Sequence, residues 1–176
     1  SCLQVVIGDN HGLNTLKHQP AKLAAIEGHW ETNRDHGMPL LLFALPNMET
    51  ESNDLEIGIP NLGSLILTHS LEGQVTGLKD FAAEDRPNAL IVFWSFRVMV
   101  GLGMLMVLLS LTALWLRKKG SLYESSWFHK FAIIMGPTGY IALLAGWVTT
   151  EVGRQPWVVY GVIRTKDGLS HTVTAD

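Results

Sequence analysis

Polar and apolar residues are separated along this chain into a mixed first half and two long apolar stretches. The stretch 88–116 carries a single charge, Arg97, and residues 131–150 carry none. Each is at least as long as the ~20 apolar residues that cross a ~30 Å hydrocarbon core as a helix. The pattern therefore predicts two transmembrane helices, at 88–116 and 131–151. Gly136-Pro137 lies inside the second one, where neighbouring helices can compensate for the lost backbone hydrogen bond.

The charges that flank these stretches predict their orientation. Arg117, Lys118, Lys119 and Lys130 all lie in the short connection at 117–130. Basic loops stay on the cytoplasmic side of a membrane. The connection is therefore predicted to be cytoplasmic, and residues 1–87 and 152–176 to lie on the outer, periplasmic side.

The outer segment is expected to be irregular. Residues 1–7 are too short to span and precede Gly8-Asp9, so they are interpreted as the tail of an earlier membrane helix. Pro20 to Trp30 predicts a short helix with proline at an early position. Glycines and prolines break 35–60 into a loop or a pair of strands, and 62–70 fits a short helix or a strand. The predicted fold is an all-α membrane protein, part of a larger helical bundle, with two transmembrane helices and a periplasmic loop segment.

The composition limits which partners and which metal or disulfide sites the chain can have. The chain is 47% hydrophobic and 16% charged with a net charge of −3, and no basic stripe with interleaved aromatics occurs. A nucleic-acid partner is not expected. Cys2 is the one cysteine, so a disulfide or thiolate cluster within the chain is excluded. The histidines have no spacing typical of a metal site.

Two residues inside the first predicted span are candidates for chemistry. A buried arginine in a membrane needs an anionic partner. Arg97 therefore fits either an ion pair with another helix or a clamp on a buried anion, such as a haem propionate. Met99 fits core packing, and its thioether also fits an axial ligand of a low-spin haem.

Two pairs of charges lie outside the apolar stretches. Glu151 and Arg154 are one helical turn apart after the second span, which fits an interfacial ion pair, an iron ligand or a proton carrier. Lys22 and Glu27 lie in the predicted helix of the outer segment. They fit a solvated helix face, or a polar site that binds a quinol head group and accepts its protons.

Five motifs occur in an order that resembles subunit I of the cytochrome bd-type quinol oxidases. They are GDNHG at 8–12, KLAAIEGHWE at 22–31, GLK at 77–79, FRVMV at 96–100 and EVGRQPW at 151–157. The resemblance covers nearly the whole chain. The combination of KLAAIE with a GRQPW that follows a membrane helix is specific, whereas one motif alone would be weak.

The resemblance implies a respiratory quinol:oxygen oxidoreductase of the bacterial inner membrane, a multi-pass protein. It implies that Lys22 and Glu27 bind quinol, that Met99 ligates the iron of low-spin haem b, and that Arg97 lies near its propionates. Glu151 is implied to ligate the iron of a high-spin haem b, with Arg154 beside it. The short segment between KLAAIE and Met99 resembles the cyanide-insensitive branch, so the oxygen site is expected to hold haem d or a second haem b.

The resemblance also implies partners. The chain lacks the family's N-terminal part, which carries further haem ligands, so that part of subunit I and a subunit II are expected partners. Membrane lipid and ubiquinol or menaquinol are the other expected partners. This chain alone is expected to be inactive. Two other interpretations are a non-catalytic relic of the oxidase and a two-span membrane anchor.

Overall fold

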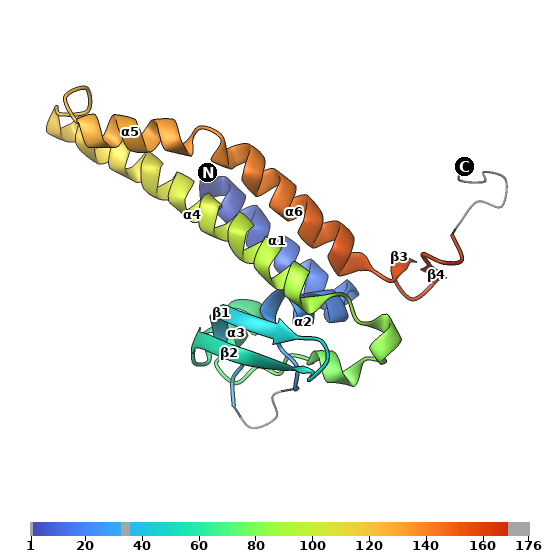
Figure 1. Cartoon of the computed structure of the whole chain (residues 1–176). Helices are drawn as coiled ribbons and strands as arrows, with labels where there is room; N and C mark the ends of the chain where they lie inside the picture. Colours follow the sequence, from blue (N-terminus) through green and yellow to red (C-terminus); the bar gives the residue numbers. More distant parts are fainter. Residues whose placement is uncertain (1, 33–35, 169–176) are drawn as a thin grey trace, which may run out of the picture.

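Two long antiparallel helical stretches form a hairpin in the computed structural model, which describes residues 2–32 and 36–168 (Figure 1). The first is α4 (Ala89–Lys119), and the second consists of α5 (Ser126–Met135) and α6 (Thr138–Arg154). Both stretches are long and apolar enough to cross a membrane. The last residues of the predicted tail, 169–176, lie outside the described residues.

Helix α4 has defined signals at both ends. The side chain of Asn88 accepts a hydrogen bond from the backbone N–H of Ile91 at 3.1 Å, which is a typical N-cap. Gly120 ends the helix in the left-handed conformation, with φ of 77°. The basic residues of the last turn lie at the negative end of the helix dipole, which stabilises the end of α4.

The second apolar stretch is interrupted, which differs from the single helix predicted at 131–151. Proline has no backbone N–H, and its ring clashes with the preceding turn. Helix α5 accordingly ends at Met135, and α6 begins at Thr138, whose hydroxyl donates to the carbonyl of Met135 at 2.7 Å. The two parts also extend further than predicted, from 126 to 154.

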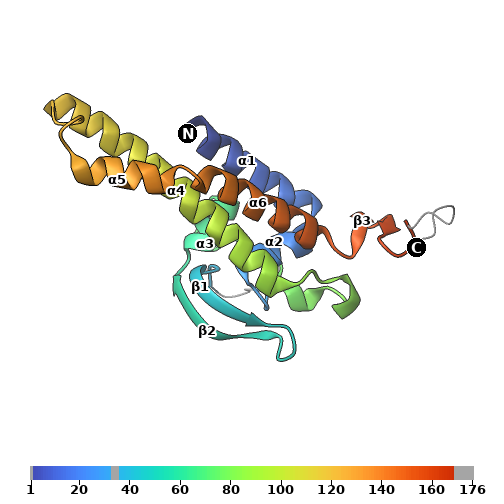
Figure 2. The same ribbon diagram turned by 45° about the horizontal axis from the view of Figure 1, so that its top comes forward.

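The first helix is also longer than the sequence suggested. Helix α1 (Cys2–His18) continues through Gly8, Asp9 and Gly12, where the predicted helix tail had ended at residue 7. Figure 2 shows α1 beside the hairpin. The chain then turns at Gln19 into α2 (Pro20–Glu27), which ends at Gly28 with φ of 65°. The short helix predicted from Pro20 is therefore present.

Two small sheets make the all-α prediction incomplete; the protein is mostly helical. Strands β1 (Leu40–Asn47) and β2 (Ser52–Ile59) pair antiparallel, with Leu40 opposite Ile59. Strands β3 (Trp157–Val159) and β4 (Ile163–Arg164) pair after α6. Between the first sheet and α4 lie α3 (Leu62–Thr68) and the 3-10 turns η1 (Leu78–Asp80) and η2 (Ala83–Asp85). The strand pair and the short helix were among the alternatives for these segments.

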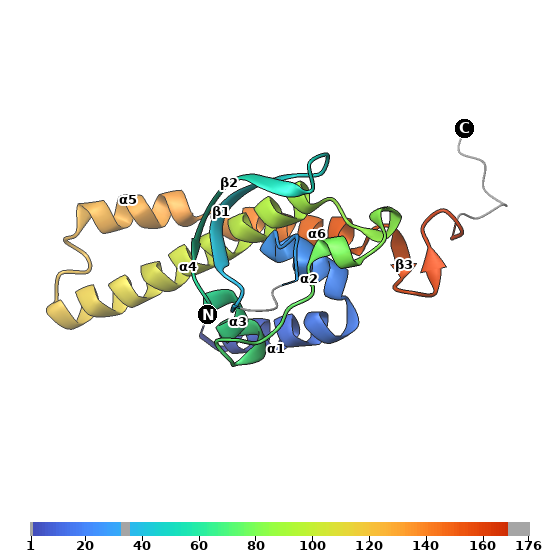
Figure 3. The same ribbon diagram turned by 90° about the horizontal axis from the view of Figure 1, so that it is seen from below.

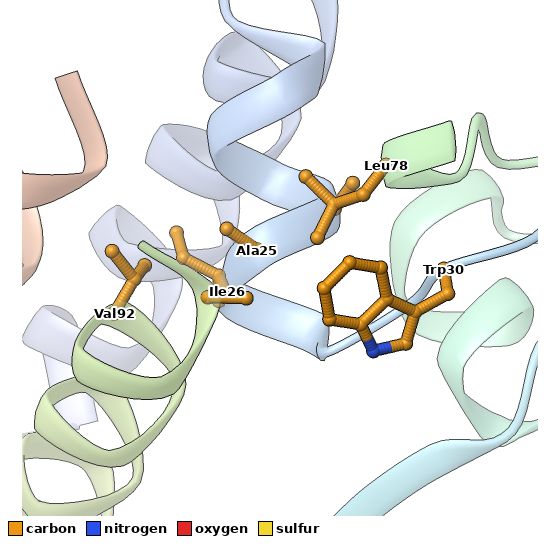
Figure 4. Packing of buried hydrophobic residues seen from close by; sticks show 7 residues of the cluster. Ala25, Ile26, Trp30, Leu78 and Val92 are labelled. Atoms are coloured by element: carbon orange, nitrogen blue, oxygen red, sulfur yellow. The ribbon is translucent and has the colours of Figure 1, made fainter. Parts of the chain in front are cut away.

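The main core lies where α2 packs on the first turns of α4. Side chains of Ala25, Ile26, Trp30, Leu78 and Val92 converge there (Figure 4). The sheet of β1 and β2 and helix α1 lie on different sides of α2 (Figure 3). Helix α2 is thus enclosed by α1, α4 and α6, and its polar side chains are held against the two apolar stretches.

Candidate functional site

A buried ion pair joins α2 to α4. The guanidinium of Arg97 donates from Nη2 to Glu27 Oε2 at 3.1 Å, and the two side chains are 13% and 8% exposed. Arg97 also donates to the carbonyl of Ile26 at 3.1 Å and to that of Leu41 at 2.9 Å. Of the two interpretations of Arg97, the ion pair with another helix is present, and the same guanidinium also binds strand β1.

The carboxyl of Glu27 is electrostatically unusual. Burial raises the pKa of Glu27 above its ordinary value, and Arg97 opposes part of that rise. A carboxyl group whose pKa lies nearer to neutral can accept a proton and release it again during turnover. Glu27 therefore has the properties of a proton acceptor.

Lys22 lies at the other end of α2, against α6. It is 9% exposed, and its aliphatic stem runs over Gly153. Burial lowers the pKa of the Lys22 ammonium, the positive charge of Arg154 lowers it further, and Glu151 opposes both. The interpretation of Lys22 and Glu27 as a solvated helix face is wrong, because both side chains are buried.

Glu151 and Arg154 form an ion pair in the last turn of α6, with both side chains partly exposed. Within the described part of the chain, the Nε–H of Arg154 and the indole N–H of Trp157 are buried and have no acceptor. Unpaired buried donors are costly, so an additional acceptor is expected here. An anionic group such as a carboxylate of a cofactor would satisfy them.

The segment after α6 is tied to the loop before α4. Arg164 of β4 contacts Asp85 at 2.8 Å and Glu84 at 3.4 Å, and its guanidinium lies over the ring of Trp157 at 5.0 Å. Thr165 donates to the side chain of Gln155 at 2.7 Å. These contacts fix the residues that follow Arg154 against the turn that precedes α4.

Met99 lies half-buried between the two long helices, two residues along α4 from Arg97. Its Sδ is 2.7 Å from the point where a Cβ would lie on Gly146 of α6. One turn away, the hydroxyls of Ser95 and Thr149 are 2.8 Å apart. The Met99 thioether therefore fills a space between α4 and α6 that exists because residue 146 is a glycine and has no side chain.

These residues can be compared with what a haem iron requires. The described residues contain no cluster of three or more His, Cys, Asp or Glu side chains that could hold a metal ion. One axial ligand per iron, however, is enough when the other comes from elsewhere. A thioether is an established ligand of haem iron, and the carboxylate ligand is what the family resemblance implies. The unsatisfied donors of Arg154 and Trp157 beside Glu151 fit the acidic edge of such a group.

Three contributors to this site were not found from the sequence. Gly146 and Gly153 lie on one helix face because seven residues make about two turns, and that spacing was the available signal. Asn53 of β2 donates to the carbonyl of Gly28 at 3.1 Å and accepts from the indole of Trp30 at 3.0 Å. It fixes the end of α2, and no pattern marked it.

The family described as cytochrome bd terminal oxidase subunit I matches residues 1–176 of the chain. The cytochrome bd ubiquinol oxidase subunit 1 of Bacillus subtilis (strain 168) is 37% identical over 171 residues, which cover 91% of this chain and 36% of that protein. The cytochrome bd-II ubiquinol oxidase subunit 1 of Escherichia coli (strain K12) is 28% identical, covering 96% of this chain and 45% of that protein.

A solved structure is also similar. The bd oxidase from Geobacillus thermodenitrificans contains a chain that matches with a TM-score of 0.73 and 34% sequence identity, over 94% of this chain and 38% of that one. The chain thus spans less than half the length of these relatives. The alignment with the Escherichia coli protein runs over 233 positions, more than the 176 residues of this chain, so that relative carries insertions.

Proposed function

Because this chain belongs to the cytochrome bd terminal oxidase subunit I family, whose members act as respiratory oxidases in the membrane, we propose that it carries the quinol-oxidising helix and two haem ligands of a quinol:oxygen oxidoreductase. The quinol site is the α2 region, and the electron acceptor is a haem held through Met99 of α4. The activity belongs to the complete oxidase, with this chain as one part.

The observation that carries the proposal is the burial of both α2 charges against the long helices. Glu27 is paired with Arg97, and the charges of Arg154 and Glu151 act on the Lys22 ammonium. Quinol oxidation releases two protons and two electrons. Glu27, with its raised pKa, accepts one of these protons, and the ammonium of Lys22 donates a hydrogen bond to a quinol oxygen.

The haem ligands are proposed as one thioether and one carboxylate. Met99 ligates a low-spin haem b and Glu151 ligates a high-spin haem b, while haem d or a second haem b occupies the oxygen site. Bound haem supplies one-electron transfer and oxygen reduction. Arg97 and Arg154 would supply positive charge for the haem propionates. The N–H groups of Arg154 and Trp157 that have no acceptor support a haem next to Glu151.

The remaining assignments complete the proposal. The proposed partners are the other part of subunit I, a subunit II, membrane lipid, and ubiquinol or menaquinol. The proposed location is a bacterial inner membrane. Residues 117–130 face the cytoplasm, whereas α2, the sheet of β1 and β2, and the segment after Arg154 face outward. The chain is assigned to the short-loop branch of the family because the segment between α2 and α4 is short.

The decisive experiment substitutes Lys22→Ala and Glu27→Ala in the complete oxidase. Quinol oxidase turnover, normalised to haem content, should fall in both variants while the haem spectrum is retained. Glu31→Ala is the matched control, since Glu31 is exposed and pairs with Lys79 at 3.0 Å on the surface. Wild-type KM and turnover in both α2 variants would refute the proposed quinol site.

A further inference from the structure

Three glycines on one face of α6 each lie under a long side chain. Gly139 faces Met106, Gly146 faces Met99, and Gly153 faces Lys22. The first two contacts are made with α4. The third is made with α2, and it links the helix that carries Glu151 to the helix that carries the quinol-site lysine.

We propose that Gly153 is a positioning residue of the quinol site, because its missing Cβ allows the Lys22 stem to cross α6 and fixes where the ammonium lies in the electrostatic field of Glu151 and Arg154. This inference rests on the proposed role of Lys22 in quinol binding. It gives the glycine of the GRQPW motif a role in binding the quinol head group, in addition to the haem chemistry proposed for its neighbours.

The contact distances carry the argument. A Cβ on Gly153 would lie 3.0 Å from Cγ, 3.2 Å from Cε and 3.4 Å from Cδ of Lys22. Most of the stem is therefore in contact, not only its flexible end, and the side chain is 9% exposed. A methyl group at this position would displace the stem by a few tenths of an ångström in an enclosed space.

Helix α2 has little freedom to relieve this contact by moving away from α6. Its far end is fixed by Arg97, which binds both Glu27 and the carbonyl of Ile26 at 3.1 Å. The displacement therefore falls on the Lys22 side chain. Its ammonium is attracted by Glu151 and repelled by Arg154, so a shift changes both its position and its electrostatic surroundings.

Helix propensity cannot explain a loss of function on substitution. Alanine favours a helix more than glycine does, and Gly153 lies inside α6. Gly153→Ala should therefore favour helix α6 itself, and its cost should arise from the contact with Lys22. If Gly153→Ala favours the helix and still impairs quinol binding, the cause is the loss of the space that the Lys22 stem occupies above residue 153.

The test is a double-mutant cycle in the complete oxidase. Gly153→Ala should raise the KM for quinol by roughly threefold to tenfold, with kcat per haem and the haem spectrum changed much less. In the Lys22→Ala background, which has no stem to displace, Gly153→Ala should change the KM little. Gly139→Ala is the control, since its Cβ would meet only Met106 Cε at an ordinary 3.7 Å.

Each outcome decides between the two proposals. If Lys22→Ala leaves the KM unchanged, the quinol role of Lys22 fails, and this inference fails with it. If Lys22→Ala raises the KM but Gly153→Ala does not, or if the two effects are additive, only the inference is overturned. If Gly153→Ala prevents assembly, recovery in the Lys22→Ala background supports the inference, and failure in both backgrounds overturns it.

Discussion

Arg97→Met tests whether the buried ion pair holds the outer segment on α4. Methionine keeps an apolar stem but has no guanidinium, so the contact of the guanidinium carbon with the Phe93 ring, 4.4 Å from the ring centre, is lost. The substitution removes the hydrogen bonds to Glu27, Ile26 and Leu41. Glu27 then remains buried without its cation.

The expected loss follows from this burial. Removing one partner of a buried ion pair costs about 3–5 kcal/mol. Since 1.4 kcal/mol is a tenfold change in an equilibrium constant, opening of α2 and β1 should become roughly a hundredfold to a few thousandfold more frequent. The matched control is Lys79→Met, which removes the pair with Glu31 on the surface and should change the opening little, because water screens exposed pairs.

Hydrogen exchange of the α2 and β1 amides in the membrane-embedded oxidase measures this opening. Without Arg97 the pKa of buried Glu27 rises further above 4.5, its ordinary value. A group whose pKa is raised by folding stabilises the folded state below its unfolded pKa, and that contribution is lost as pH rises. Protection, corrected for intrinsic exchange, should therefore fall with increasing pH, and adding Glu27→Gln should remove this dependence. Equal protection in Arg97→Met and Lys79→Met would refute the reasoning.

Four further predictions concern chemistry and topology. Quinol turnover should fall as the pH is lowered, and the fall should begin above pH 4.5, because burial raises the pKa of Glu27. Glu27→Gln should remove this acidic limb of the pH–rate profile. Met99→Leu should abolish the low-spin haem signal in a reduced-minus-oxidised spectrum and leave the oxygen-site haem. Glu151→Gln should lower high-spin haem content and oxygen reduction more than quinol binding, and full haem content with normal turnover would reject its role as a ligand. Of two reporter proteins fused at Ser121, one active only in the cytoplasm and one active only in the periplasm, the cytoplasmic one should be active.

The elements that the sequence identified are those with strong local signals. The charge-free stretches, the basic connection and the proline at the start of α2 are each visible within a few residues. Helix α1 was underestimated because Gly8 and Asp9 are weak helix formers, although they do not end the helix here. The all-α prediction missed β3 and β4 because strands of three and two residues are too short to show a periodicity.

The candidate site was only partly visible for a different reason. Lys22, Glu27 and Arg97 were each singled out, but their arrangement depends on contacts between distant parts of the chain. Glu27 and Arg97 are 70 residues apart. The role of Gly153 depends on the lysine that crosses it, and a single sequence does not reveal which side chain fills the space above a glycine.

The burial along α4 sets how much of this helix faces lipid. Its first turn belongs to the core under α2, and Phe93 packs with Leu41 and Ala44 of β1. Near the other end of α4, Lys119 lies over the ring of Trp115 at 5.3 Å. From Phe93 to Trp115 a helix rises about 33 Å, close to the ~30 Å hydrophobic thickness of a bilayer. In the proposed orientation, the segment that precedes α4 and the tryptophan–lysine contact mark the two water boundaries. In a thinner bilayer the hairpin must tilt, and the outer segment, fixed to α4 through Arg97, must tilt with it.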